Sequence, residues 1–234
     1  MTLWSALVWI VGACVVGFAI TAIFSSWLRL SRDLFLVPYL AFGSIFLVAF
    51  FVMNDIDVVA LLRDNWVWGV VVGILLAIFL VRNVRLQPRS KGPQGSYLVV
   101  EILWAGLLYG LMDGILLSVM PVVAIWEGMR DWPWFGTLLG GLVASIAVSV
   151  SYHLGYKEFR NERIKYPVIG PGIMTLGVIV SGNPLAAIIS HPVMHIAAVI
   201  HGPDTTVQLP PHRESVPEAQ TTKSPTSEPA RAGL

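Results

Sequence analysis

Apolar runs of nearly membrane-spanning length recur along the first 202 residues. A helix needs about 20 largely apolar residues to cross a hydrocarbon core of roughly 30 Å. Hydrophobic residues make up 56% of the chain and charged residues 12%, whereas a soluble domain carries about 25% charged residues. The sequence therefore predicts an all-α, polytopic transmembrane helical bundle. About seven spans are expected, at 3–28, 34–53, 66–81, 97–125, 133–153, 167–181 and 183–202.

Two of these runs need separate treatment. No Lys or Arg precedes the run at 3–28, and it exceeds the roughly 7–15 apolar residues of a signal peptide. We therefore expect it to be a retained span. The last two runs are separated only by Ser181-Gly182-Asn183-Pro184, which is typical of a tight turn. Residues 167–202 are thus two spans, one broken helix or a re-entrant pair.

The distribution of Lys and Arg predicts the orientation of the chain. Alternate loops, with the C-terminal tail, hold 13 of the 15 basic residues and the other loops hold 2. Basic loops face the cytoplasm, so the N-terminus is expected outside a cell membrane and the C-terminus inside. The 13 residues of the basic-rich set are Arg29, Arg32, Arg82, Arg85, Arg89, Lys91, Lys157, Arg160, Arg163, Lys165, Arg213, Lys223 and Arg231.

The chain changes character at Pro203. Residues 203–234 contain no aromatic residue and many Pro, Ser and Thr, a composition with too little apolar surface to offset the entropy of ordering. They predict a disordered cytoplasmic tail after a bundle at 1–202, although 203–212 can still dock on that bundle. The lipid bilayer is the predicted partner, and no binding of nucleic acid is expected. The single cysteine, Cys14, excludes an intrachain disulfide.

Among the ionisable residues inside the predicted spans, five stand out as deep acidic or histidine side chains, each of which costs about 2.5–3.5 kcal/mol unless it faces a cavity or a partner. They are Glu101, Asp113, His153, His191 and His195. A rise of about 1.5 Å per residue places Glu101, His153 and His195 at similar depths in the cytoplasmic half. Asp113 matches the level of His191, which shares a helix face with His195.

Tyr109 is a further candidate, because it lies two turns beyond Glu101 on a similar helix face. From there its hydroxyl could reach the Glu101 carboxylate. Tyr109 and Asp113 are therefore the predicted binding residues of the site.

Three short segments together resemble the CPBP family, which contains membrane-embedded CAAX prenyl-protein endopeptidases and bacteriocin-processing proteins. They read VEILWAG at 100–106, SVSYH at 149–153 and HPVMH at 191–195. The corresponding family motifs are EExxxRG, FxxxH and HxxxN or HxxxH. The resemblance covers about 97–202. Val100 and Ala105 stand where the family has glutamate and arginine, and Ser149 where it has phenylalanine.

The resemblance implies an intramembrane endopeptidase acting on a membrane-bound peptide, with Glu101, His153, His191 and His195 as catalytic residues. Glu101 would take a proton from a water held by His153, and His191 and His195 would stabilise the oxyanion. Whether the site holds a cofactor is left open; histidine side chains together with Glu101 could bind a zinc ion.

Three other functions remain open. The same groups could form a polar network in a non-proteolytic binding or scaffold protein. They could bind haem between the fifth and seventh spans, or act as the proton relay of a transporter.

Overall fold

The computed structural model describes residues 1–211, and these residues form helices and loops without a strand. Six helices are long and apolar enough to cross a membrane, and a shorter apolar helix, Leu185–His201, follows them. The all-α bundle predicted from the sequence is confirmed, and the chain is a multi-pass membrane protein. The six long helices are Leu3–Trp27, Arg32–Met53, Trp66–Arg85, Gly95–Gly128, Trp134–Leu154 and Glu162–Ser181.

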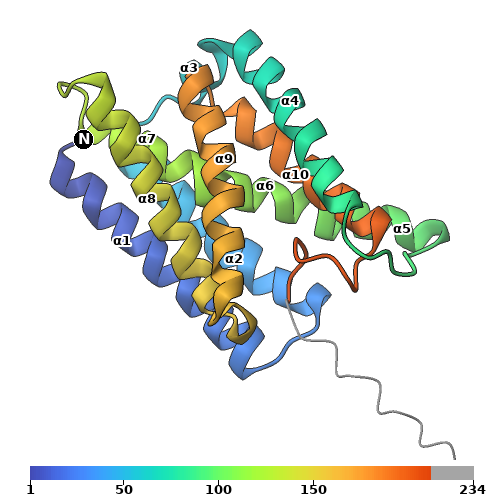
Figure 1. Cartoon of the computed structure of the whole chain (residues 1–234). Coiled ribbons are helices and arrows are strands. Elements are labelled where there is room, and N and C mark those ends of the chain that lie inside the picture. The colour runs from blue at the N-terminus through green and yellow to red at the C-terminus, as the bar shows by residue number, and fades with distance from the viewer. Residues whose placement is uncertain (212–234) are drawn as a thin grey trace, which may run out of the picture.

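Figure 1 shows these helices in chain order. A π-helical stretch (η1) forms the end of the first long helix, two more (η2 and η3) lie within Gly95–Gly128, and two 3-10 turns (η4 and η5) precede α9. The elements are α1 (Leu3–Ile20), η1 (Thr21–Trp27), α2 (Arg32–Met53), α3 (Val58–Arg63), α4 (Trp66–Arg85), α5 (Gly95–Glu101), η2 (Ile102–Leu108), α6 (Tyr109–Asp113), η3 (Gly114–Val119), α7 (Met120–Gly128), α8 (Trp134–Leu154), η4 (Lys157–Phe159), η5 (Glu162–Ile164), α9 (Lys165–Ser181) and α10 (Leu185–His201).

A tight turn separates α9 from α10. Gly182 ends α9 in the left-handed conformation, with φ 62°, which favours glycine. The buried Asn183 amide nitrogen donates hydrogen bonds to the carbonyl oxygens of Leu61, Leu62 and Asp64, at 3.1, 3.0 and 2.6 Å. Residues 167–202 therefore form two helices, and their turn is fastened to the end of α3.

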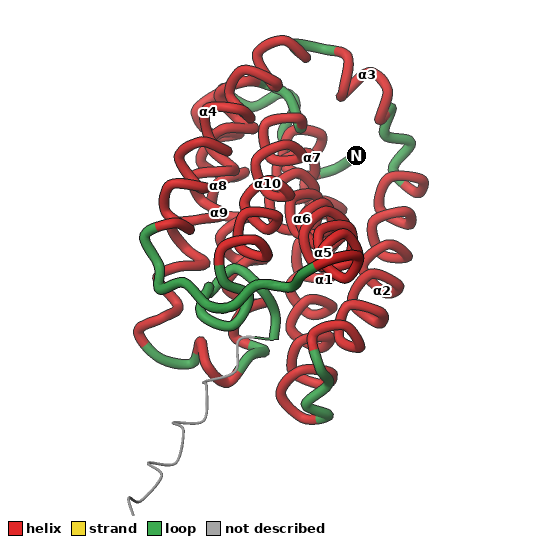
Figure 2. Tube along the Cα trace, turned by 90° about the vertical axis from the view of Figure 1, so that its right-hand side faces the viewer, coloured by secondary structure: helices red, strands yellow, loops and turns green. Residues whose placement is uncertain are grey.

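The helix Gly95–Gly128 (α5, η2, α6, η3 and α7) is the centre of the bundle. Within its most apolar stretch 83% of the residues are buried, against 28% in Leu3–Trp27, Trp66–Arg85 and Trp134–Leu154. Figure 2 views this central helix nearly end-on, between α2 and α10. We call it the central helix from here on.

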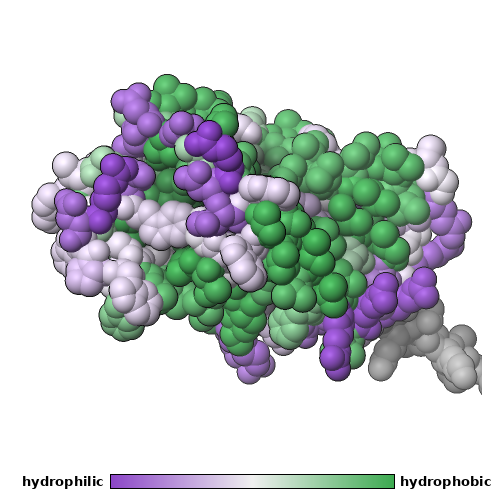
Figure 3. Space-filling view, turned by 90° about the horizontal axis from the view of Figure 1, so that it is seen from above, coloured by the Kyte–Doolittle hydropathy of each residue, from purple (hydrophilic) through white to green (hydrophobic). Residues whose placement is uncertain are grey.

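The outer helices turn apolar side chains away from the centre. Trp4, Phe42, Ile78 and Val180 are all at least half exposed, and hydrophobic residues cover much of the face in Figure 3. Because lipid solvates apolar side chains, these faces are where the protein contacts the hydrocarbon of a bilayer.

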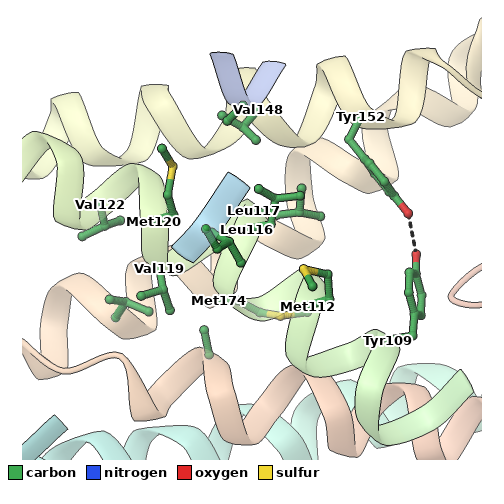
Figure 4. Packing of buried hydrophobic residues seen from close by; sticks show 14 of the residues in the cluster. Tyr109, Met112, Leu116, Leu117, Val119, Met120, Val122, Val148, Tyr152 and Met174 are labelled. Atoms are coloured by element: carbon green, nitrogen blue, oxygen red, sulfur yellow. Dashed lines mark hydrogen bonds between the residues drawn. The ribbon is translucent and has the colours of Figure 1, made fainter. Parts of the chain in front are cut away.

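Glycines allow α10 to approach the central helix closely. A Cβ atom added at Gly110 would lie 2.5 Å from Pro192 Cα, and one at Gly106 would lie 2.8 Å from Ile196 Cγ1. Small residues at such spacing are the usual device for close helix packing in membranes. The opposite side of the central helix packs Met112, Leu116, Leu117 and Met120 into the core, as Figure 4 shows.

The chain after α10 folds back beneath the bundle. Arg32 Nε donates to the Pro210 carbonyl at 2.7 Å and Arg32 Nη2 to the Pro203 carbonyl at 2.6 Å. Leu209 is buried. The structured part therefore continues past the predicted boundary at residue 202, as far as residue 211. The predicted disorder of 213–234 lies outside the described residues.

The loops of the basic-rich set meet at one end of the bundle. Ser26 Oγ donates to the Gly155 carbonyl at 2.7 Å, which joins the chain after α1 to the chain after α8. Gln87 and Gln208 are joined by a side-chain hydrogen bond of 2.9 Å, which links the loop after α4 to the docked C-terminal segment. The predicted topology requires the basic-rich loops to lie together at one end of the bundle in this way.

Candidate functional site

A cavity of about 90 Å³ lies inside the bundle and collects four of the ionisable residues. It has room for several water molecules. Asp113 reaches it from the central helix, His153 from α8, and His191 and His195 from α10. The remaining wall comes largely from α9 and from the docked segment, through residues that include Tyr166, Pro167, Met174, Val207 and Gln208.

Asp113 is the only carboxylate among the residues that line this cavity. Its side chain is almost fully buried, with 3% exposure. One oxygen, Oδ1, accepts a short hydrogen bond from the Tyr39 hydroxyl of α2. The other, Oδ2, lies 3.7 Å from His195 Nε2. Tyr39 thus fixes one carboxylate oxygen and leaves the second facing the histidines.

The two histidines of α10 are stacked in parallel beside this carboxylate. Their ring centroids are 5.7 Å apart with an interplanar angle of 9°, as expected from i, i+4 spacing. His191 Nδ1 has no hydrogen-bond partner among the described residues, and neither ring nitrogen of His195 has one of normal geometry. The backbone of Gln208 interacts with the ring of His195, and Tyr109 packs edge-on against it at 4.7 Å.

His153 lies at the other side of the cavity, one residue before the end of α8. Its Nδ1 is 2.8 Å from the Ser149 carbonyl, and a carbonyl can only accept, so Nδ1 carries the proton. In the neutral ring Nε2 then holds the lone pair. The ring is held between Tyr152 and Phe159, each with a centroid distance of 5.0 Å. The imidazole is therefore fixed in both orientation and tautomer.

A row of buried tyrosines joins the cavity to the basic-rich end of the bundle. The hydroxyls of Tyr109 and Tyr152 point toward each other at 3.1 Å (Figure 4), and those of Tyr152 and Tyr156 are 2.9 Å apart. Tyr156 lies beyond the end of α8, where burial raises its pKa well above 10.0. The Tyr156 hydroxyl therefore stays protonated near neutral pH, and the three hydroxyls form one continuous hydrogen-bonded row.

Glu101 does not belong to this site, which corrects the predicted grouping. It does not line the cavity, and the groups that interact with its carboxylate are Tyr97, Asp33 and Arg32. The central helix has 34 residues and is about 50 Å long. The prediction that Glu101, His153 and His195 lie at similar depths assumed that this helix spans a core of roughly 30 Å. Glu101 is the last residue of α5, which lies at the right-hand edge of Figure 1. The residues of the central helix that meet His195 are Tyr109 and Gly110, eight and nine positions further on.

The other predicted site residues do come together. Tyr109, Asp113, His153, His191 and His195 all line one cavity. Tyr109 bonds to Tyr152, however, and not to Glu101. Sequence reasoning missed the further contributors Tyr39, Tyr152, Tyr156 and Gln208. A tyrosine inside the otherwise apolar run 34–53 was the available signal for Tyr39.

The donor atoms of Asp113, His191 and His195 could hold a metal ion. One ligand atom from each lies within 4.8 Å of the other two, and all three residues are buried. A haem group does not fit, because ligand pockets for organic molecules typically have about 300–1,000 Å³ and this cavity has about 90 Å³.

We compared the chain with protein-family models, with curated proteins and with solved structures, and none matches.

Proposed function

We propose that this protein is an intramembrane endopeptidase of the CPBP type, with its site at Asp113, His153, His191 and His195. One observation carries the proposal: a carboxylate and three imidazoles from three separate helices line one cavity inside the bundle, which has room for several water molecules. A network that served packing alone would pair its polar atoms, yet His191 Nδ1 lacks a partner among the described residues.

The residue types supply the chemistry of amide hydrolysis. Asp113 activates a water in the cavity, which attacks the scissile carbonyl carbon. The ring N–H of neutral His195 or His191 donates a hydrogen bond to the developing oxyanion. The proton from the water passes to the leaving amine, so no further reactant is consumed. Positioned acid–base groups of this kind contribute about 10²–10⁴-fold in rate.

The substrate in this proposal is a membrane-bound peptide, and the cavity requires an opening step to admit it. Val207 and Gln208 of the docked segment form part of the cavity wall. The hydrogen bond between Gln87 and Gln208 and those from Arg32 hold that segment in place. Displacement of residues 203–211 would open the cavity toward the basic-rich end of the bundle.

In the proposed topology that end faces the cytoplasm, with the N-terminus outside the cell membrane. The clustering of the basic-rich loops supports it through the positive-inside rule. Reporter fusions at the two termini should report opposite sides of the membrane. Fusions that report the same side would contradict this topology.

The activity test uses the full chain in lipid nanodiscs with fluorogenic peptides, both plain and prenylated. The wild type should cleave at least one class, and Asp113→Asn should lower turnover by about 100-fold or more, because an amide cannot act as a base. Glu101→Gln is the matched control and should stay within about twofold of wild type. The proposal fails if the wild type cleaves nothing, or if Asp113→Asn retains full turnover.

A further inference from the structure

We propose that Asp113, His191 and His195 bind one divalent first-row transition-metal ion, of which zinc and iron are the best candidates. The inference rests on the site of the proposed function, but not on its reaction. Three observations about the donor atoms, their supports and the open side of the site carry it.

The first observation is the donor set itself. Two imidazoles and one carboxylate converge with their ligand atoms within 4.8 Å of one another. Tetrahedral zinc with bonds of about 2.0–2.1 Å would hold ligand atoms about 3.3 Å apart. The ligand atoms thus need to approach one another by up to about 1.5 Å, which side-chain rotation can supply. Imidazole and carboxylate suit zinc and iron, whereas calcium and magnesium prefer oxygen alone.

The second observation is that both histidines have a buried ring nitrogen without a hydrogen-bond partner among the described residues. His191 Nδ1 and His195 Nε2 are buried and lack hydrogen bonds of normal geometry within the described residues. Buried ring nitrogens without a partner destabilise the folded chain. A bound cation would satisfy the nitrogens and offset the buried charge of Asp113 at the same time.

The third observation is the arrangement around the ligands. Tyr39 donates to Asp113 Oδ1 and leaves Oδ2 toward His195, which is how an outer-shell hydrogen bond orients a ligating carboxylate. His153, across the cavity, is fixed through Ser149 and is not in the ligand group. A three-ligand site beside a water-sized space is typical of catalytic metal centres, which keep one position open.

An ion held there would change how Asp113 acts. It would lower the pKa of a bound water to about 7, and His153, fixed with its lone pair on Nε2, could accept the proton of that water. Asp113 would then act as a ligand and not as the direct base.

Cobalt(II) binding to the full chain, purified in detergent and stripped with a chelator, provides the test. We expect one Co²⁺ per chain with the visible absorption of a site bound by nitrogen and oxygen ligands, displaced by Zn²⁺. His191→Gln and His195→Gln should each weaken binding at least tenfold. His201→Gln is the matched control, because His201 is at the end of the same helix and bonds to the Gln87 carbonyl.

Tyr39→Phe tests the orienting role separately and should weaken binding by about 10–100-fold while the fold persists. The proposal is overturned if the folded wild type binds no stoichiometric cobalt or zinc, or if His201→Gln loses as much affinity as His191→Gln. Metal content and peptide cleavage are independent readouts. A chain that binds metal but cleaves nothing would therefore retain this inference and end the proposed function.

Discussion

The central helix carries two carboxylates in different surroundings, one near its start and one in its middle. Glu101 interacts with Tyr97, Asp33 and Arg32, outside the cavity. Asp113, twelve residues later, lies between Tyr39 and His195 with 3% exposure. In this chain the glutamate that matches the family motif lies outside the cavity, and the carboxylate beside the histidines is Asp113.

Packing explains why the two positions differ. The middle of the central helix touches both α2 and α10, and its glycines bring the α10 backbone close. At its start the exposed side chains of Tyr97 and Val100 face outward. A charged group in the middle must find a partner or a cavity, whereas Glu101 has Arg32 nearby.

The largest effect should come from Asp113→Leu. It leaves the Tyr39 hydroxyl and His195 without their carboxylate, and each buried polar group left without a partner costs about 1–3 kcal/mol. Unfolding in a denaturing detergent titration measures this change. An effect below that of Glu101→Leu would mean that the middle of the helix is not the more constrained region.

Gly110→Ala should have the next largest effect. Its added Cβ would lie 2.5 Å from Pro192 Cα and 3.0 Å from His195 Cδ2, and overpacking of this kind costs about 1–3 kcal/mol. Gly172→Ala is the control, because a Cβ there meets nothing within 4 Å; it should be neutral or stabilise by about 0.5–1 kcal/mol. Equal melting temperatures for the two variants would contradict close packing of α10.

Tyr152→Phe should destabilise the protein by about 1–2 kcal/mol, because it breaks the hydrogen bonds to both Tyr109 and Tyr156. Ser151, its neighbour on α8, supplies the control Ser151→Ala, which should change stability by less than about 0.5 kcal/mol. Thermal unfolding followed by circular dichroism checks both.

The fall in the free energy of unfolding at alkaline pH tests the burial of Tyr156. Because burial raises its pKa well above 10.0, the folded chain keeps a proton that the unfolded chain releases above about pH 10. This contribution is fully present below about pH 10 and is lost as pH rises above it. Tyr156→Phe should therefore show a shallower fall than wild type between about pH 10 and 11. An identical slope would contradict the burial.

Glu101→Gln should have the smallest effect, within about 1 kcal/mol of wild type. Glu101 is buried, but it lies outside the cavity, and an amide of the same shape can still hydrogen-bond to Tyr97. Unfolding measured in parallel with Asp113→Asn sharpens the contrast between the two regions. A loss as large as that of Asp113→Asn would show that Glu101 is as constrained as the middle of the helix.

The spans and the histidine cluster were predictable because hydropathy and i, i+4 spacing are local properties. His191 and His195 share a helix face by spacing alone, and their polarity inside a span indicated a cavity. The central helix was not predictable in the same way. Its run resembles the other spans in composition, but its burial of 83% arises from how the others pack around it. The choice between Glu101 and Asp113 depended on that packing.

Tyr39 and Gln208 illustrate the same limit. Tyr39 is 74 residues from Asp113 in the chain, so no local pattern joins them. Gln208 lies in a segment whose composition is typical of disorder, yet the carbonyl groups of Pro203 and Pro210 accept hydrogen bonds from Arg32. Those bonds depend on a residue of α2 that composition does not reveal.

The most direct measurement of the central claim is the coupling free energy of unfolding between Asp113 and His195, obtained from a double-mutant cycle with Asp113→Asn and His195→Gln. A parallel cycle pairs Glu101→Gln with His195→Gln. Residues in contact couple by about 0.5–3 kcal/mol and distant ones add within about 0.3–0.5 kcal/mol. We expect a coupling of about 0.5–3 kcal/mol between Asp113 and His195, and additive effects for Glu101 and His195. Coupling of His195 to Glu101, with none to Asp113, would contradict this assignment of the site.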